Sequence, residues 1–262
     1  ATFASAHRPD LVLRIGRPTV DGAWRRLIGT TELLVDPHGG WHDPWRSTSE
    51  LLVADPASLL VAVASRLPVA AGSDWADAWS EADATAAMVV DRTVATATSL
   101  TGPGVARAVL DAVPSGGVLT VGSSLPVRDL DRTPAVRPDV RMLANRGAAG
   151  IDGTVSTALG AALGTGLPSW ALLGDHTFLH DTNGLLAQPG SPSPDVTFVV
   201  VDNGGGRIFD GLPPGRHASG LERLFTAPHG RDLAALARAH GLATHEADAA
   251  DALTAALRDR AA

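Results

Sequence analysis

The sequence predicts an α/β protein with a doubly wound parallel sheet, covered by helices on both faces. Near-continuous apolar runs such as WALLG and TFVVV suit strands that are buried on both sides. From about residue 101 such runs alternate regularly with helical patterns, which places consecutive strands parallel in one sheet. Polar and small residues follow three of these strands, at VGSS, LLGD and VVDNGGG. Ligands of such sheets bind beyond the carboxyl ends of the strands, so these three positions are the candidate site.

Composition excludes several classes of function. The chain has 262 residues, 45% of them hydrophobic, which is enough for one large or two modest domains. A net charge of −7 argues against a nucleic-acid footprint, and the absence of cysteine excludes disulfides and thiolate metal sites. There is no lysine, which excludes a Walker-type phosphate lysine and Schiff-base chemistry. Neither a long apolar run nor a signal peptide is found, so a cytoplasmic location is expected.

The first hundred residues are predicted to form an α/β region with fewer strands than the region that follows. Trp75, Trp79 and Met88 recur at helical spacing, and this stripe is predicted to pack in a core rather than to bind a cofactor. Strands are expected at 10–16 and 31–36, a loop at 36–49, and helices at 56–65 and 73–97.

The rest of the chain carries the regular alternation, and its elements can be assigned in order. Strands are expected at 116–124, 139–145, 169–175 and 195–203, and helices at 102–113, 152–164, 176–187, 232–241 and 251–262.

Two polar strand ends carry the chemistry. Asp175 follows one apolar strand, and Asp202-Asn203 follows the next, with a single helix between them. One right-handed crossover would bring these ends together in space. Carboxylate and amide oxygens are ligands that Mg²⁺ accepts, and a helix that begins near His176 would offer its N-terminus to a diphosphate. Taken alone, Asp-Asn-Gly is more often an ordinary turn.

The spacing of GD and N-x-G resembles the metal–diphosphate motif of thiamine-diphosphate enzymes. The segments GSSLPVR, NRGAAGIDGTVSTALG, GDHTFLHDTNGLL and VVVDNGGGRIFDGLP are similar to one family among them. These are the 2-succinyl-5-enolpyruvyl-6-hydroxy-3-cyclohexene-1-carboxylate (SEPHCHC) synthases of menaquinone biosynthesis. The resemblance is close from about Gly122 to Leu212 and looser outside it, where GRPT at 16–19 is similar to the family's central domain.

The resemblance implies a role for individual residues. Asp175, Asn203 and the Gly205 carbonyl would ligate Mg²⁺ or Mn²⁺, and Ile151 would support thiamine diphosphate in its bent shape. Arg128 and Arg146 would bind substrate carboxylates, because guanidinium groups pair with carboxylates in a bidentate manner. Further contacts would come from Ser123, Ser124, Gly174, His176 and Thr177 to the cofactor, and from Ile208, Phe209 and Leu212 to the substrate.

The reaction implied by the resemblance is a transferase reaction. Thiamine diphosphate would support decarboxylation of 2-oxoglutarate and addition of the remaining succinyl unit to isochorismate, giving SEPHCHC. The cofactor supplies the difficult chemistry, and the protein binds and orients it. Members of the family assemble as homodimers or tetramers, and the resemblance implies no nucleic acid and no membrane span.

Two residues depart from the superfamily pattern. His176 replaces the last glycine of Gly-Asp-Gly, and Asp202 replaces the first asparagine of an Asn-Asn pair. An ionised Asp202 would add negative charge near the diphosphate, so its side chain is expected to point away. Two other interpretations of these segments are less favoured: a zinc site at His176 and His180, which lacks a third ligand, and a nucleophile at Ser123, which lacks a G-x-S-x-G elbow.

An activating glutamate is expected to be missing from this chain. In the family it belongs to a separate N-terminal domain, and none of the five glutamates here follows an apolar strand in the matching way; they are Glu32, Glu50, Glu81, Glu222 and Glu246. The chain therefore reads as part of a Rossmann-like central domain (1–100) followed by the diphosphate-binding domain (101–262), without its last strand. Two rivals stay open: another thiamine-diphosphate decarboligase, of the acetolactate-synthase type, and a non-catalytic nucleotide- or partner-binding module.

Overall fold

The chain forms two compact units, Ala1–Met88 (unit 1) and Val89–Ala262 (unit 2). The computed structural model describes residues 2–18, 30–68, 73–133, 135–145, 150–186, 190–216 and 218–261.

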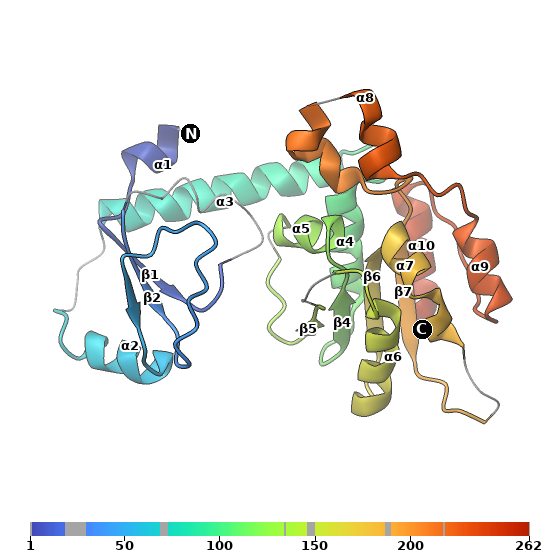
Figure 1. Cartoon of the computed structure of the whole chain (residues 1–262), viewed down its shortest axis with the longest axis horizontal. Coiled ribbons are helices and arrows are strands. Elements are labelled where there is room, and N and C mark those ends of the chain that lie inside the picture. Colours follow the sequence, from blue (N-terminus) through green and yellow to red (C-terminus); the bar gives the residue numbers. More distant parts are fainter. Residues whose placement is uncertain are drawn as a thin grey trace. The chain divides into compact units, whose positions relative to one another are not determined.

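Unit 1 contains a parallel sheet of three strands in the order β1-β2-β3 (Figure 1). The strands are β1 (Leu11–Ile15), β2 (Thr31–Val35) and β3 (Glu50–Leu52). The first two confirm the sequence prediction. The third was not predicted, because three residues are too few to show a periodic pattern.

The helices of unit 1 leave its apolar residues largely exposed. They are α1 (Thr2–Ala6), α2 (Pro56–Ala64) and α3 (Asp74–Ala95), the last of which continues into unit 2. Helix α2 begins as its sequence indicates, since the Asp55 side chain accepts the Ser58 N–H at 2.8 Å. The prediction that the tryptophan–methionine stripe packs in a core is wrong: Trp75 is 45% exposed and Met88 is 65% exposed.

A buried charged cluster holds the end of the unit 1 sheet. The Arg14 side chain, on β1, is 4% exposed and its Nε lies 2.5 Å from a Glu32 carboxylate oxygen on β2. Its other nitrogens donate to the carbonyl oxygens of Gly16 and His42 and to the Thr48 hydroxyl. The cluster therefore ties two strands to the loop before β3, through a buried charge that makes four hydrogen bonds.

Unit 2 contains a parallel sheet of four strands in the order β5-β4-β6-β7 (Figure 1). Its strands are β4 (Val118–Val121), β5 (Arg141–Leu143), β6 (Ser169–Gly174) and β7 (Val196–Val201). All three pairings are parallel, and all four strands fall within segments predicted from the sequence.

Four of the five helices predicted for unit 2 are found as single helices, the fifth is divided, and α5 and α8 were not predicted. The predicted helix 176–187 divides into α7 and a 3-10 turn, because the Asp181 carboxylate accepts the N–H and the hydroxyl of Ser156 and leaves the helical path. The helices are α4 (Gly102–Ala112), α5 (Leu125–Asp131), α6 (Thr154–Thr165), α7 (Asp175–His180), α8 (Ala218–Leu221), α9 (Leu233–Ala239) and α10 (Ala250–Ala261). Short 3-10 turns cover Thr182–Leu185, Arg207–Gly211 and Pro213–Arg216, and a π turn covers Glu222–Thr226.

Both faces of this sheet are covered, as its class requires. Alternate residues of β6 enter different clusters: Trp170 and Leu172 pack with α4 and α10, and Ala171 and Leu173 pack with α6 and α7. This alternation explains why the strand reads as continuously apolar. No described helix of the chain is both long and apolar enough to span a bilayer.

Candidate functional site

The carboxyl ends of β6 and β7 meet at one edge of the unit 2 sheet. Gly174 on β6 is in register with Val201 on β7, so Asp175 and Asp202 leave the two strands side by side. The sequence-based expectation that one crossover would bring these two ends together is confirmed.

Asp175 is a buried carboxylate with fixed oxygens. It is 3% exposed and is the first residue of α7. One oxygen accepts the His176 N–H at 2.6 Å, and the other accepts the Gly205 N–H at 2.7 Å. Two backbone donors thus hold the charge in place, one from each side of the gap between the strands.

Asn203 provides an oxygen without a partner. Its Oδ1 atom is buried and has no hydrogen-bond partner among the described residues. A buried acceptor that makes no hydrogen bond is costly, and such an atom calls for a missing ligand. Two residues close to Asn203 in the chain contact Asp175. Gly205 donates its N–H to the Asp175 carboxylate, and Asp202 belongs with Asp175 to the cluster described below.

Gly205 is required by its conformation and by its surroundings. Its φ is +120°, and a Cβ atom there would lie 2.2 Å from the Thr226 carbonyl oxygen. The next residue, Gly206, donates its N–H to the same oxygen at 2.7 Å. The Gly205 carbonyl accepts the Arg207 N–H at 2.8 Å and keeps a second lone pair for another partner. The triple glycine is therefore a close-packed turn between β7 and the π turn.

Asp202 lies beside Asp175 at this edge of the sheet, and the expectation that its side chain points away from the diphosphate stays a prediction. Single ligand atoms of Asp175, Asp202 and His229 all lie within 4.8 Å of one another. The His229 Nε2 atom is 3.4 Å from Asp175 Oδ2 and 3.4 Å from Asp202 Oδ1. Sequence reasoning missed His229, since it follows Asp175 by 54 positions, in a loop with no motif around it.

The end of β4 brings other predicted residues together. The Ser123 hydroxyl donates to the Asn145 carbonyl at 3.3 Å, and a Cβ atom on Gly150 would lie 2.6 Å from the Ser123 Cβ. Ser124 has a φ of +74°, which is rare for a residue with a side chain, and its carbonyl accepts from Arg128 at 2.7 Å. The predicted cofactor contacts of Ser123 and Ser124 stay predictions, as does the carboxylate-binding role of Arg128.

The remaining predicted residues surround these strand ends or fall outside the described residues. Ile151 is half-buried before α6, and Thr177 is buried on α7. Ile208 and Phe209 are half-buried on the 3-10 turn after β7, where the Phe209 ring lies 5.3 Å from that of Phe225. Leu212, at the end of this turn, is 42% exposed. Arg146 falls in the segment 146–149, outside the described residues.

The rival zinc interpretation finds no support in the geometry. The His176 ring nitrogen contacts the Ala227 carbonyl at 3.0 Å, and that of His180 lies 3.4 Å from Asp152. Within the described ranges, the one group of three or more potential metal-binding side chains is the Asp175–Asp202–His229 cluster.

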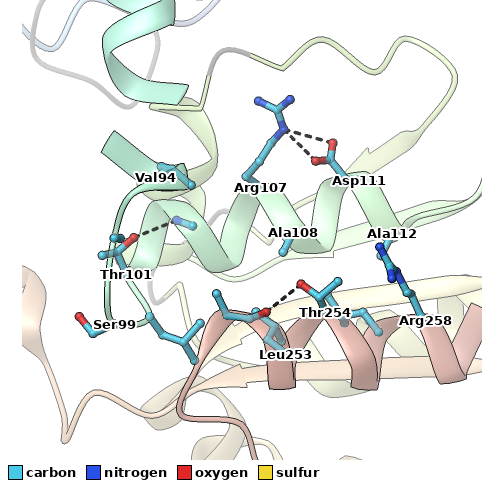
Figure 2. A pocket seen from close by; sticks show the side chains of 15 residues that line it. Val94, Ser99, Thr101, Arg107, Ala108, Asp111, Ala112, Leu253, Thr254 and Arg258 are labelled. Carbon is cyan, nitrogen blue, oxygen red and sulfur yellow. Dashed lines mark hydrogen bonds and ion pairs between the residues drawn. The ribbon is translucent and has the colours of Figure 1, made fainter. Parts of the chain in front are cut away.

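A hollow of about 590 Å³ lies elsewhere in unit 2, along α4 and α10 (Figure 2). Leu253 lines it together with Arg107, whose Nε is already bound to Asp111 at 3.0 Å. Its lining comes from helices on one face of the sheet and from the segment before α4, and includes none of the predicted residues at the strand ends.

The comparisons with known proteins agree with this geometry. Residues 129–262 match the family described as "Thiamine pyrophosphate enzyme, C-terminal TPP binding domain". The chain belongs to this family, and its unit 2 carries the thiamine-diphosphate-binding fold.

Curated relatives narrow the resemblance. The chain is 42% identical over 245 residues to a 2-succinyl-5-enolpyruvyl-6-hydroxy-3-cyclohexene-1-carboxylate synthase of Saccharopolyspora erythraea, covering 92% of this chain and 42% of that protein. Proteins of the same name are 39% identical in Sorangium cellulosum (97% of this chain, 44% of that one) and 41% identical in Nocardioides sp. (88% and 45%). The sequence resemblance to SEPHCHC synthases is confirmed. The chain spans less than half the length of these relatives.

The site fits a divalent cation and a diphosphate. The unpartnered Asn203 oxygen, the fixed Asp175 carboxylate and the Gly205 carbonyl are all hard oxygen donors, which suit Mg²⁺. The glycines at 204–206 add no side chains to the turn beside them. Nothing in this donor set is soft or redox-active, which agrees with a structural ion that binds phosphate oxygens.

Proposed function

We propose that this chain carries the cofactor-anchoring half of a SEPHCHC synthase, which decarboxylates 2-oxoglutarate and adds the succinyl unit to isochorismate. The observation that carries the proposal is the buried, unpartnered Asn203 oxygen, at the strand-end edge where Asp175 is held. The 42% identity to a relative of that name supports the choice among thiamine-diphosphate reactions.

Asp175, Asn203 and the Gly205 carbonyl would hold Mg²⁺ or Mn²⁺, and the ion would hold the cofactor's diphosphate. Bound thiamine diphosphate supplies a thiazolium carbon that attacks 2-oxo acids and stabilises the charge left by CO₂. The residues of this chain would fix the position of the cofactor, and the two backbone donors that hold the Asp175 carboxylate would orient it for the ion.

Arg128 and Arg146 would bind the carboxylates of the two acidic substrates. The support for Arg128 is its place on α5, the helix that follows β4, where its Nη1 donates to the Ser124 carbonyl and other N–H donors of the guanidinium remain for a carboxylate. Ile208, Phe209 and Leu212 would form the apolar wall of the substrate pocket. Half-burial of Ile208 and Phe209 on the turn after β7 is compatible with this role.

Activation of the cofactor would need a carboxylate from outside this chain. Glu32 is paired with Arg14 in unit 1, and the other four glutamates are exposed. The same proposal includes a cytoplasmic homodimer or tetramer, whose mass light scattering would measure.

The test is decarboxylation by the purified chain, with and without a polypeptide that carries the family's pyrimidine-binding domain. With Mg²⁺, thiamine diphosphate and 2-oxoglutarate, the chain alone should release no CO₂ above background. Addition of the second polypeptide should restore release, and isochorismate should then yield SEPHCHC. CO₂ release by the chain alone would contradict the missing-carboxylate argument.

The rivals predict different results in the same assay. An acetolactate-synthase type would consume pyruvate in preference to 2-oxoglutarate, although the arginines at 128 and 146 favour dicarboxylates. A non-catalytic module would show no turnover with either substrate and no metal-dependent binding of thiamine diphosphate.

A further inference from the structure

His229 belongs to the Asp175–Asp202–His229 cluster, but it has no role in the proposed cofactor site. Its side chain is 10% exposed, and its Nε2 atom has no hydrogen-bond partner among the described residues. The nearest charged atoms are the Asp175 and Asp202 oxygens, each at 3.4 Å. A buried nitrogen that lies at equal distances from two carboxylates and makes no hydrogen bond requires an explanation.

The other ring nitrogen determines where the proton lies. His229 Nδ1 accepts the backbone N–H of Arg231 at 3.0 Å. An imidazole nitrogen that accepts a hydrogen bond carries no proton, so the ring proton is on Nε2. Metal-binding histidines show the reverse arrangement, in which the second nitrogen donates. His229 is therefore a donor that faces the carboxylates and not a metal ligand.

Three contacts fix the loop that presents His229. The Thr226 carbonyl accepts the Gly206 N–H at 2.7 Å, and the Ala227 N–H bonds to the Glu222 carbonyl at 2.7 Å. The His176 ring contacts the Ala227 carbonyl at 3.0 Å. The loop is thus anchored to both strand ends two residues before His229, which places this residue beside the two carboxylates.

We propose that His229 is a positioning residue that binds the Asp202 carboxylate when Asp175 binds the metal. In the metal-free arrangement Nε2–H lies too far from either oxygen for a normal hydrogen bond. Once a cation binds the Asp175 carboxylate, Asp202 is the one carboxylate of the pair that can accept a hydrogen bond from the Nε2–H of His229. Bound in this way, Asp202 keeps its negative charge directed at His229 and away from the cofactor's diphosphate.

The inference rests on the proposed cofactor site, and it explains how an aspartate is tolerated there. Asp202 is held from a second side as well, since its Oδ1 atom accepts the Gly204 N–H at 3.1 Å. Without His229, the Asp202 charge would lie beside the anion-binding site with only this backbone donor. Binding of a diphosphate would then be opposed by charge repulsion.

The test is a double-mutant cycle read by calorimetric titration of thiamine diphosphate at saturating Mg²⁺. His229→Ala should weaken binding by about tenfold or more, as loss of an outer partner of a metal centre typically does. His229→Gln places an amide N–H near the Nε2 position and should restore binding to within about threefold of the original chain. His245→Ala, at an exposed position, is the matched control and should have no effect.

The Asp202→Asn background isolates the mechanism. Asp202→Asn alone should bind the cofactor at least as tightly as the original chain. In this background His229→Ala should change the affinity for thiamine diphosphate by less than about twofold, because the Asp202 charge that His229 would bind has been removed. An equal loss in both backgrounds, or no loss in either, would overturn the proposal. If the original chain itself shows no Mg²⁺-dependent binding, the proposed function fails instead, and the two failures are thereby distinguished.

A separate measurement tests whether His229 binds the metal ion directly. Co²⁺ bound to the chain should give a visible absorption spectrum that His229→Gln leaves unchanged. A shift of this spectrum on substitution would show that Nε2 binds the ion, and would contradict the positioning role.

Discussion

The two parallel sheets of this chain differ in how they are covered. In unit 2 the central strands β4 and β6 are packed on both faces, and β6 buries alternate residues in opposite clusters. In unit 1, Leu34 and Val35 are the two buried apolar side chains among the described residues, and Leu11, Leu13 and Ile15 of β1 remain exposed by 37–51%. A parallel sheet gains most of its stability from burial of both faces. The candidate site lies at the ends of two strands of the better-covered sheet.

Unit 1 depends more on its charged cluster than on a core, and this can be tested first. Arg14→Met would leave the Glu32 carboxylate buried and unpaired, at a cost of about 3–5 kcal/mol. Hydrogen exchange measured by mass spectrometry should show strong loss of protection in peptides of 11–15 and 31–35. Peptides of β4 and β6 should keep their protection, and thiamine diphosphate affinity should stay within about twofold. Equal loss in both units would show that the sheets are not independent.

A matched pair of leucines compares the two sheets directly. Leu119 on β4 is 0% exposed, and Leu13 on β1 is 37% exposed. Leu119→Ala should destabilise unit 2 by about 2–5 kcal/mol, through lost burial and the cavity left behind. Leu13→Ala should cost under about 1 kcal/mol, since that side chain already contacts solvent. Urea denaturation followed by circular dichroism would measure both, and similar costs would contradict the difference in cover.

Substitution of Gly205 should affect both the stability of the glycine turn and the binding of the cofactor. Gly205→Ala would place a Cβ atom 2.2 Å from the Thr226 carbonyl, in a backbone with φ +120°. The strained backbone alone costs about 1–3 kcal/mol, and the clash would separate the glycine turn from the loop that carries His229. We expect at least a tenfold loss of Mg²⁺-dependent cofactor affinity, about 1.4 kcal/mol. Gly211→Ala, with open space around its Cβ position, is the control and should bind normally.

The smallest predicted effect concerns a surface ion pair of unit 2. The Arg137 guanidinium, which donates a hydrogen bond to Asp139, lowers the pKa of that carboxyl to about 2. A carboxyl with a lowered pKa adds stability above its unfolded pKa of 3.8, and this contribution is lost as the pH falls toward 2. Carboxyl ¹³C NMR should show Asp139 titrating near pH 2, and Arg137→Met should move the midpoint up toward 3.8. An unchanged midpoint would remove Arg137 as the cause.

Local patterns predicted the four strands of unit 2, most clearly β4 and β6, which are buried along nearly their whole length, and they predicted helix α4, which begins with a side-chain cap at Thr101. They were less successful where a tertiary contact decides the outcome. The helix 176–187 is interrupted because Asp181 bonds to Ser156 on α6, and no pattern in that segment indicates this contact. The tryptophan–methionine stripe has helical spacing, and Trp75 and Trp79 both donate to the His7 carbonyl, but within the described part of the chain Trp75 and Met88 stay exposed.

The candidate site was predictable where it follows strand ends. Asp175 and Asn203 lie at one edge because β6 and β7 are neighbours in register. The prediction that Asp202 points away from the diphosphate was argued from charge repulsion alone, without the donor that lies beside it in the structure. That donor, His229, comes from a loop 54 positions after Asp175, and nothing in the local sequence relates the two. Only the folded chain brings this imidazole between the carboxylates.

The measurement that tests the central claim most directly is the binding of thiamine diphosphate to the chain with Mg²⁺ and with EDTA. Calorimetric titration should show binding with Mg²⁺ present and none with EDTA, because the Asp175 and Asn203 oxygens reach the diphosphate only through the ion. Asp175→Ala should abolish the Mg²⁺-dependent signal, and Asn203→Ala should weaken it less severely. Unchanged affinity in Asp175→Ala, or equal binding in EDTA, would contradict a metal–diphosphate site at the ends of β6 and β7.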